Sequence, residues 1–135
     1  MRTKFQDGFT LMEVMVASAI LALFIIGCYK MVEGALWMNQ SARDHYVAVN
    51  LADSRLERAR NLQYATYSDL LETQLVMAAD GTPSMTGPYR RTTSVNTNYG
   101  VILTEFVVQV DIRNHRTGAF DGINEQLATV LPSKQ

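Results

Sequence analysis

The stretch FTLMEVMVASAILALFIIGCY, residues 9–29, decides the fold of the N-terminal part of this chain. It holds one charged residue, Glu13, and no proline, so it can form a helix without a break. A helix of this length covers roughly 30 Å, the thickness of the hydrocarbon core of a bilayer. The sequence therefore predicts a single membrane span.

The charges that flank this stretch predict its orientation. Arg2 and Lys4 precede it, and positively charged flanks stay on the cytoplasmic side of a membrane. We therefore expect the N-terminus in the cytoplasm and the chain after Lys30 outside it.

The composition excludes several classes of protein. The 135 residues include 12 Lys plus Arg and 13 Asp plus Glu, whereas a nucleic-acid coat needs a clear basic excess. The single cysteine, Cys28, can form neither an internal disulfide nor a cysteine-rich zinc site. No phosphate-binding glycine loop, GxSxG or HExxH pattern is present. The sequence predicts neither an enzyme nor a resident cofactor.

Glu13 is the unusual residue of the apolar stretch. A charge inside hydrocarbon costs roughly 2.5 to 3.5 kcal/mol on insertion scales, so an intramembrane carboxylate is expected to have a function and a cationic partner. The stretch itself contains no cation, and Lys30 lies about 25 Å further along a helix. The partner is therefore expected to come from elsewhere.

The run DGFTLMEVMVASAIL, residues 7–21, resembles the cleavage and methylation motif of type IV prepilins and type II secretion pseudopilins. A short basic leader ends in Gly8, and Phe, Thr, Leu, any residue and Glu follow. The resemblance implies that a prepilin peptidase cuts between Gly8 and Phe9 and that Phe9 is then N-methylated. It implies that Glu13 attracts the Phe9 amine of a neighbouring subunit. It also implies other pilin or pseudopilin subunits and an inner-membrane assembly platform as partners.

Small and branched side chains follow the motif, and they suit close packing between membrane helices. The residues expected to pack are Leu11, Val14, Ala17 and Leu21.

An alternative concerns the end of the same stretch. IIGC, residues 25–28, resembles a lipoprotein acylation site, in which Cys28 would become the lipid-modified first residue. The chain would then be a lipid-anchored or single-pass periplasmic binding module. A secretory signal has no use for the carboxylate of Glu13, which favours the prepilin interpretation.

The helix is expected to continue beyond the membrane, because no proline occurs before Pro83. Spacings of three and four predict a buried stripe on it, formed by Met38, Ala42, His45, Val49, Ala52, Leu56 and Ala59. We expect His45 to be packed and hydrogen-bonded rather than a metal ligand, since no second histidine lies at helical spacing. The helix should end near residues 61–64.

The last turns of this helix carry Arg55, Arg58 and Arg60, interleaved with acidic residues. This pattern predicts a solvated face on which Glu57 pairs with Arg60. The stretch NLADSRLERARNL, residues 50–62, is similar to the corresponding helix of minor pseudopilins of the I type and their pilus counterparts.

After the helix the pattern changes from helical periodicity to turn signals and short β-branched runs. Residues 64–88 predict a connecting loop with one short helical turn near residues 70–79. Three later segments predict antiparallel strands, with a turn at 114–118 between the second and third. These segments are 89–95, 101–113 and 125–131. Three strands need support, so we expect them to pack on the helix.

Some residues of the strand region are candidates for binding. Some pseudopilins bind calcium near the C-terminus, and Asp111 and Asp121 offer carboxylate oxygens, but without the spacing of a calcium loop; turn-capping roles are favoured. Four arginines are candidates for contact with DNA, which some pilus relatives bind: Arg90, Arg91, Arg113 and Arg116. The neighbouring Glu105 and Asp111 favour a mixed charged surface, so no nucleic acid is expected.

The predicted fold class is α+β, with a long N-terminal helix packed on a small antiparallel sheet of about three strands, which is also what the pilin resemblance implies. The predicted parts are a leader at 1–8, a membrane or filament-core helix at 9–33, its amphipathic continuation at 34–63, a connecting loop at 64–88 and the sheet region at 89–135. The predicted function is that of a structural subunit of a type IV pilus or a type II secretion pseudopilus, anchored in the inner membrane. The lack of a cysteine pair favours a pseudopilin or a minor pilin over a disulfide-bearing major pilin, and at about 127 mature residues the subunit is expected to be a minor component.

Overall fold

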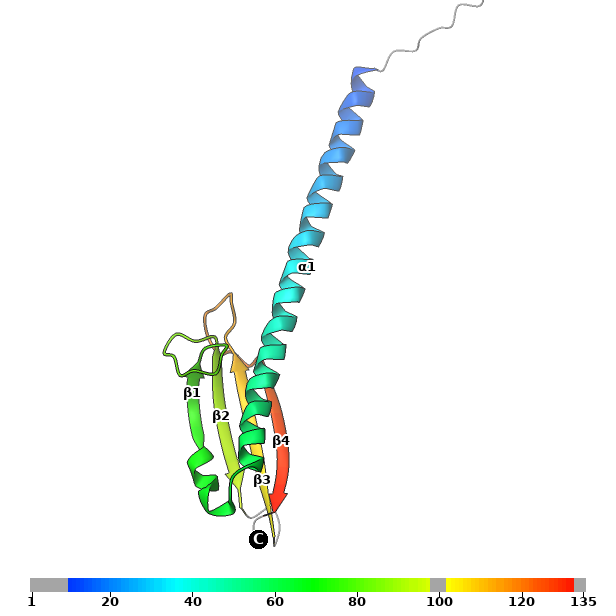
Figure 1. Ribbon diagram of the computed structural model, residues 1–135. Coiled ribbons are helices and arrows are strands. Elements are labelled where there is room, and N and C mark those ends of the chain that lie inside the picture. Colours follow the sequence, from blue (N-terminus) through cyan, green and yellow to red (C-terminus); the bar gives the residue numbers. More distant parts are fainter. Residues whose placement is uncertain (1–9, 98–101, 133–135) are drawn as a thin grey trace, which may run out of the picture. The chain divides into compact units, whose positions relative to one another are not determined.

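The computed structural model describes residues 10–97 and 102–132 and combines one long helix with an antiparallel sheet (Figure 1). The elements are α1 (Leu11–Arg60), the 3₁₀ helix η1 (Tyr64–Leu70), β1 (Glu72–Met77), β2 (Tyr89–Asn96), β3 (Leu103–Ile112) and β4 (Asn124–Pro132). The chain divides into two compact units, residues 1–40 and 41–135, with the boundary inside α1.

In the N-terminal unit α1 is apolar on all sides. It is long and apolar enough to cross a membrane, as judged by length and composition, and its most apolar window has a mean hydropathy of 2.4. Large apolar side chains from Leu11 to Met38 are exposed around the helix. Because apolar surface favours transfer out of water, this part of α1 needs a membrane or other helices around it.

In the C-terminal unit the strands form a meander in the order β1-β2-β3-β4, with every neighbouring pair antiparallel (Figure 1). Tyr89 pairs with Ile112 at one end of the β2–β3 ladder, and Leu103 pairs with Pro132 in the β3–β4 ladder. The end of α1 packs on one face of this sheet. The buried core joins Ala48, Leu51, Ala52, Leu56 and Ala59 of α1 to Tyr67, Leu70, Met77, Tyr89, Phe106, Val108, Val110 and Ile112.

The α+β prediction is confirmed, but the sheet has four strands, because β1 lies where a loop with a helical turn at 70–79 was expected. Leu75, Val76 and Met77 pair with β2, and Met77 is fully buried. The register shifts between Glu72 and Leu75, and Gln74 has a φ of +53°. This irregularity hides the two-residue alternation that identifies a strand in sequence.

The other boundaries are close to those predicted. The helix ends at Arg60, and β2, β3 and β4 begin and end within two residues of the predicted strands where these fall in the described part of the chain; Val101 lies outside it.

The buried stripe of α1 differs in part from the predicted one. Ala52, Leu56 and Ala59 are buried as expected, whereas Met38 and Ala42 are exposed. Only the part of α1 from residue 48 onward contributes buried side chains to the core, and this face also includes Ala48, Leu51 and Arg55. Helical periodicity alone does not reveal where the supporting sheet begins.

Candidate assembly site at the start of the helix

Thr10 sets the start of α1. Its Oγ1 accepts a hydrogen bond from the Glu13 backbone N–H at 3.2 Å, and its carbonyl oxygen accepts from the N–H groups of Glu13 and Val14 at 3.0 and 3.2 Å. Threonine suits this position because its hydroxyl gives the Glu13 N–H a second acceptor in the first turn, where no carbonyl four residues earlier belongs to the helix. Gly8 and Phe9, the predicted cleavage and methylation residues, lie outside the described residues.

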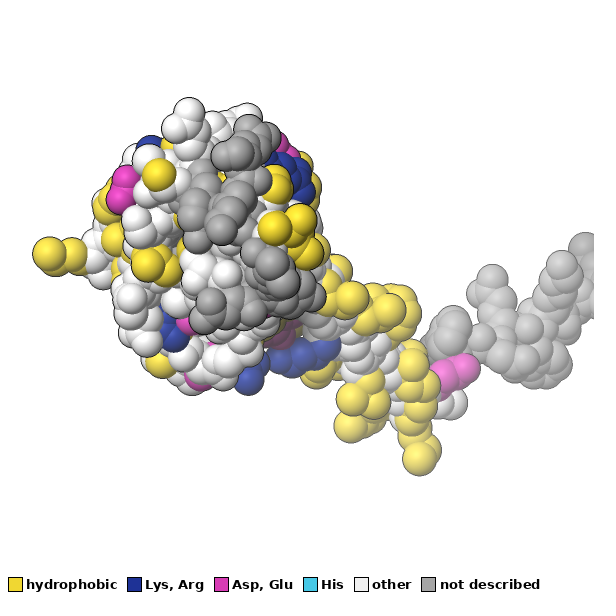
Figure 2. All heavy atoms as spheres, turned by 90° about the horizontal axis from the view of Figure 1, so that it is seen from below, with side chains coloured by type: hydrophobic (Ala, Val, Ile, Leu, Met, Phe, Trp, Pro, Cys, Tyr) yellow, Lys and Arg dark blue, Asp and Glu magenta, His cyan; other side chains and the backbone are white. Residues whose placement is uncertain are grey.

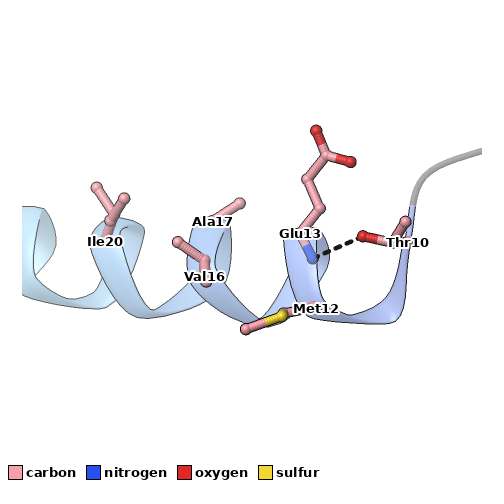
Figure 3. A pocket seen from close by; sticks show the side chains of 6 residues that line it. All are labelled: Thr10, Met12, Glu13, Val16, Ala17 and Ile20. Atoms are coloured by element: carbon pink, nitrogen blue, oxygen red, sulfur yellow. Dashed lines mark hydrogen bonds between the residues drawn. The ribbon is translucent and has the colours of Figure 1, made fainter.

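The Glu13 carboxylate projects from the helix on the same side as Ala17 and Ile20 (Figure 3). Positions 13, 17 and 20 share one face of a helix. These three side chains, with Thr10, Met12 and Val16, line an open hollow on the surface of α1. Ala17 is small, so a neighbouring helix can approach the carboxylate closely there.

The predicted packing residues are accessible to another helix. Leu11, Val14 and Leu21 are exposed large apolar residues, and Ala17 is exposed in the hollow beside Glu13. Their contact with another subunit stays a prediction.

A buried charge cluster in the C-terminal unit corrects the prediction that Arg55 is solvated. Arg55 is only 8% exposed; its Nη2 lies 2.7 Å from Glu72 Oε1 and donates to the Leu70 carbonyl oxygen at 3.0 Å. Arg91, equally buried, donates to the same carboxylate through Nε at 2.7 Å and Nη2 at 3.1 Å. Burial lowers the pKa of Arg55, Glu72 opposes this effect, and Arg91 adds to it. One carboxylate therefore holds two buried guanidinium groups.

A signal for this cluster was present in the sequence. Arg55 lies three or four residues from Leu51, Ala52 and Ala59, which are core residues. A long charged side chain at core spacing indicates a buried ion pair when an acidic side chain can reach it. Here the acidic partner is Glu72 of β1, and the sequence did not reveal this strand. On the solvated face the predicted pair of Glu57 and Arg60 is confirmed.

Both histidines bind carboxylates across the C-terminal unit. His45 is hydrogen-bonded, as expected, with its Nδ1 at 2.6 Å from Glu125 Oε1 of β4, and it is half-buried. His115 Nε2 lies 2.8 Å from Asp44 Oδ2, and the Tyr89 hydroxyl donates to Asp44 Oδ1 at 3.3 Å. Burial, followed by the negative charge of Asp44, raises the pKa of Tyr89 to about 12. These contacts attach β2, β4 and the connection between β3 and β4 to α1.

The other predicted candidates take part in local contacts. Arg90 donates to Asp111 Oδ2 through Nε at 2.9 Å and Nη2 at 2.7 Å. The guanidinium carbons of Arg90 and Arg113 lie 4.6 and 4.9 Å from the centre of the Phe120 ring. Asp121 Oδ2 accepts hydrogen bonds from two side chains of its own loop, as a turn-capping residue would.

These contacts produce a mixed surface. Figure 2 shows basic and acidic side chains scattered among apolar and uncharged ones on the face in view. Within residues 10–97 and 102–132, no group of three or more His, Cys, Asp or Glu side chains is placed to hold a metal ion.

Comparison with known families points to the start of α1. Residues 3–29 match the prokaryotic N-terminal methylation motif. No curated protein and no solved structure matches the chain. The chain therefore carries a prepilin-type methylation motif at the head of a long helix, in an α+β, pilin-like fold. Proteins of the pilin family are structural, not enzymes.

Proposed function

We propose that the chain is a structural subunit of a type IV pilus or a type II secretion pseudopilus. The observation that carries this proposal is the match of residues 3–29 to the methylation motif, at the start of a helix whose apolar side chains are exposed. Apolar surface of this extent favours burial, which a bilayer provides before assembly and packed helices provide afterwards. The subunit is anchored in the inner membrane through α1, with its C-terminal unit outside the cytoplasm.

Processing creates the partner that Glu13 lacks. A prepilin peptidase cuts between Gly8 and Phe9, and the new amine on Phe9 is N-methylated. In the low-dielectric core of a filament this cationic amine pairs with the Glu13 carboxylate of a neighbouring subunit. The small side chain of Ala17 beside the exposed carboxylate supports such an approach. The inner-membrane assembly platform and other pilin or pseudopilin subunits complete the set of partners.

The finer assignment is to a minor subunit. It is supported by the lack of a cysteine pair in these 135 residues, and the similarity of residues 50–62 to I-type pseudopilins and their pilus counterparts adds to it. The lipoprotein alternative, in which Cys28 would be the first residue, rests on the stretch IIGC alone and leaves Glu13 without a role.

The decisive experiment replaces Glu13 with alanine in the full-length chain and measures its incorporation into sheared filaments. We expect processing at Gly8 and membrane retention to persist. Incorporation should fall by at least about tenfold, because removing one partner of a buried ion pair costs roughly 3 to 5 kcal/mol. Insertion into the membrane should improve slightly, because a charge has left the apolar stretch.

Glu33→Ala is the matched control, because Glu33 lies on the same helix but pairs with Lys30 at 2.8 Å on an exposed surface. We expect this variant to enter filaments like the wild type. Normal incorporation of Glu13→Ala would remove the pairing role.

A further inference from the structure

The connection between β1 and β2 is built as a hydrogen-bonded loop. The Ala78 N–H donates to the Thr82 carbonyl oxygen at 2.9 Å, and the Ser84 N–H donates to the Val76 carbonyl oxygen at 3.0 Å. Asp80 Oδ1 accepts from both the N–H and the hydroxyl of Thr82, at 2.9 and 2.7 Å. These hydrogen bonds lower the pKa of Asp80, so the turn keeps its charged cap.

Gly87 brings the end of the same loop close to the end of β1. At Gly87 a Cβ would overlap the backbone carbonyl of Met77, so only glycine allows this approach. Met77 also forms an isolated bridge with Pro83. The loop is therefore held at both of its ends.

Met85 lies on this loop and is 98% exposed. Met77, at the end of β1, is 0% exposed in the core. The two methionines are thus close in sequence and at opposite extremes of accessibility. The thioether sulfur of methionine is a nucleophile, and it attacks the oxygen of any peroxide that can reach it.

We propose that Met85 is the oxidation site of the C-terminal unit, converted to methionine sulfoxide by hydroperoxides while Met77 is protected. The Sδ lone pair of Met85 attacks one peroxide oxygen, an S–O bond forms and the O–O bond breaks. The other oxygen leaves as hydroxide and takes the proton of the sulfur-bound hydroxyl, which gives water and methionine sulfoxide. Sulfur loses two electrons and the peroxide gains them, so hydrogen peroxide is the only co-reactant.

The position of Met85 makes this oxidation compatible with the fold. A sulfoxide is polar, and water already surrounds the Met85 side chain, so the new oxygen needs no protein partner. The same change at Met77 would place a polar group in the core. This proposal does not depend on the proposed function, because it concerns the accessibility of two residues within one unit.

The experiment treats the full-length chain in detergent micelles with hydrogen peroxide, quenches at intervals and digests with trypsin. Met77 and Met85 fall in one tryptic fragment, residues 61–90, which contains no internal Lys or Arg. Fragmentation spectra of this peptide give the oxidation rates of both methionines. Because both lie in one peptide, differences in peptide recovery do not affect the comparison. In the folded chain we expect Met85 to react at least about tenfold faster than Met77.

Unfolding supplies the reference rate. In guanidinium chloride the two rates should agree to within about twofold, since both sulfurs are then in water. Met85→Leu should remove the fast oxidation of this fragment and leave the slow reaction of Met77. Comparable rates of Met77 and Met85 in the folded chain would overturn the proposal, and so would a Met85 rate that rises tenfold on unfolding.

Discussion

Glu13 and Glu72 show how the surroundings of a carboxylate decide its role. Glu72 has a side chain that is 16% exposed and lies against Arg55 and Arg91, so its charge is satisfied within the chain. Glu13 lies on an exposed apolar helix, and between residues 9 and 29 no other charged residue accompanies it. A buried charge is costly without a partner, and Glu72 has two partners within the fold; under the proposed function, Glu13 takes its partner from another subunit.

Glu13 could be identified from the sequence because its apolar neighbours are contiguous in the chain. Glu72 and Arg55 could not be paired in this way, because their contact depends on the position of β1 against α1. The sequence therefore predicted the candidate site at the start of the helix and missed the charge cluster of the C-terminal unit.

Replacement of Glu72 by glutamine tests the charge cluster at the residue scale. It leaves the guanidinium groups of Arg55 and Arg91 buried without a counter-charge, so we expect the free energy of unfolding to fall by about 3 kcal/mol or more. Arg55→Met leaves the pair of Glu72 with Arg91 and should cost less. Urea unfolding of the full-length chain in detergent, followed by circular dichroism, measures both values.

The control for this series is Arg58→Ala, because Arg58 is exposed on the same helix. Its effect should stay within about 0.5 kcal/mol. A larger loss of stability for Arg55→Met than for Glu72→Gln would contradict this prediction. It would show that the cluster is not stabilised mainly by the charge of Glu72.

At the scale of elements, the strands that could be predicted from the sequence are those that pair regularly with their neighbours. β2, β3 and β4 are paired without interruption, and buried and partly exposed residues alternate along much of β3. β1 has a register shift next to Gln74, and its six residues are too few to show a period on the far side of it. Pairing with β2 overrides the weak local preference of this segment.

The β1–β2 loop gives a prediction at this scale. Gly87→Ala forces a Cβ against the Met77 carbonyl, so the loop has to move away from the strand end that it holds. We expect a loss of about 2 to 4 kcal/mol in the free energy of unfolding. Thr86→Ala, at the exposed neighbouring position, should leave the value nearly unchanged. Thermal unfolding of the two variants side by side decides, and equal stabilities would show that the close approach at Gly87 is not required.

At the scale of the whole molecule, α1 serves two units with different requirements. Before residue 40 its apolar side chains are exposed on every side, whereas after residue 48 only one face is buried, against the sheet. A single helix can meet both requirements because nothing in its sequence interrupts it, there being no proline before Pro83. Under the proposed function, the first part is covered by lipid and then by other subunits, while the second part keeps its own sheet.

Processing is the prediction that belongs to the whole chain. Intact mass of the protein recovered from membranes should correspond to a chain that begins at Phe9 and carries one added methyl group. Glycine before the cut leaves the backbone unobstructed, so Gly8→Leu should leave the full-length precursor in the membrane. Gly27→Leu is the matched control, because space around Gly27 is open and this variant should be processed normally. A recovered chain that begins at a lipid-modified Cys28 would establish the lipoprotein alternative, since that product cannot arise from a cut at Gly8.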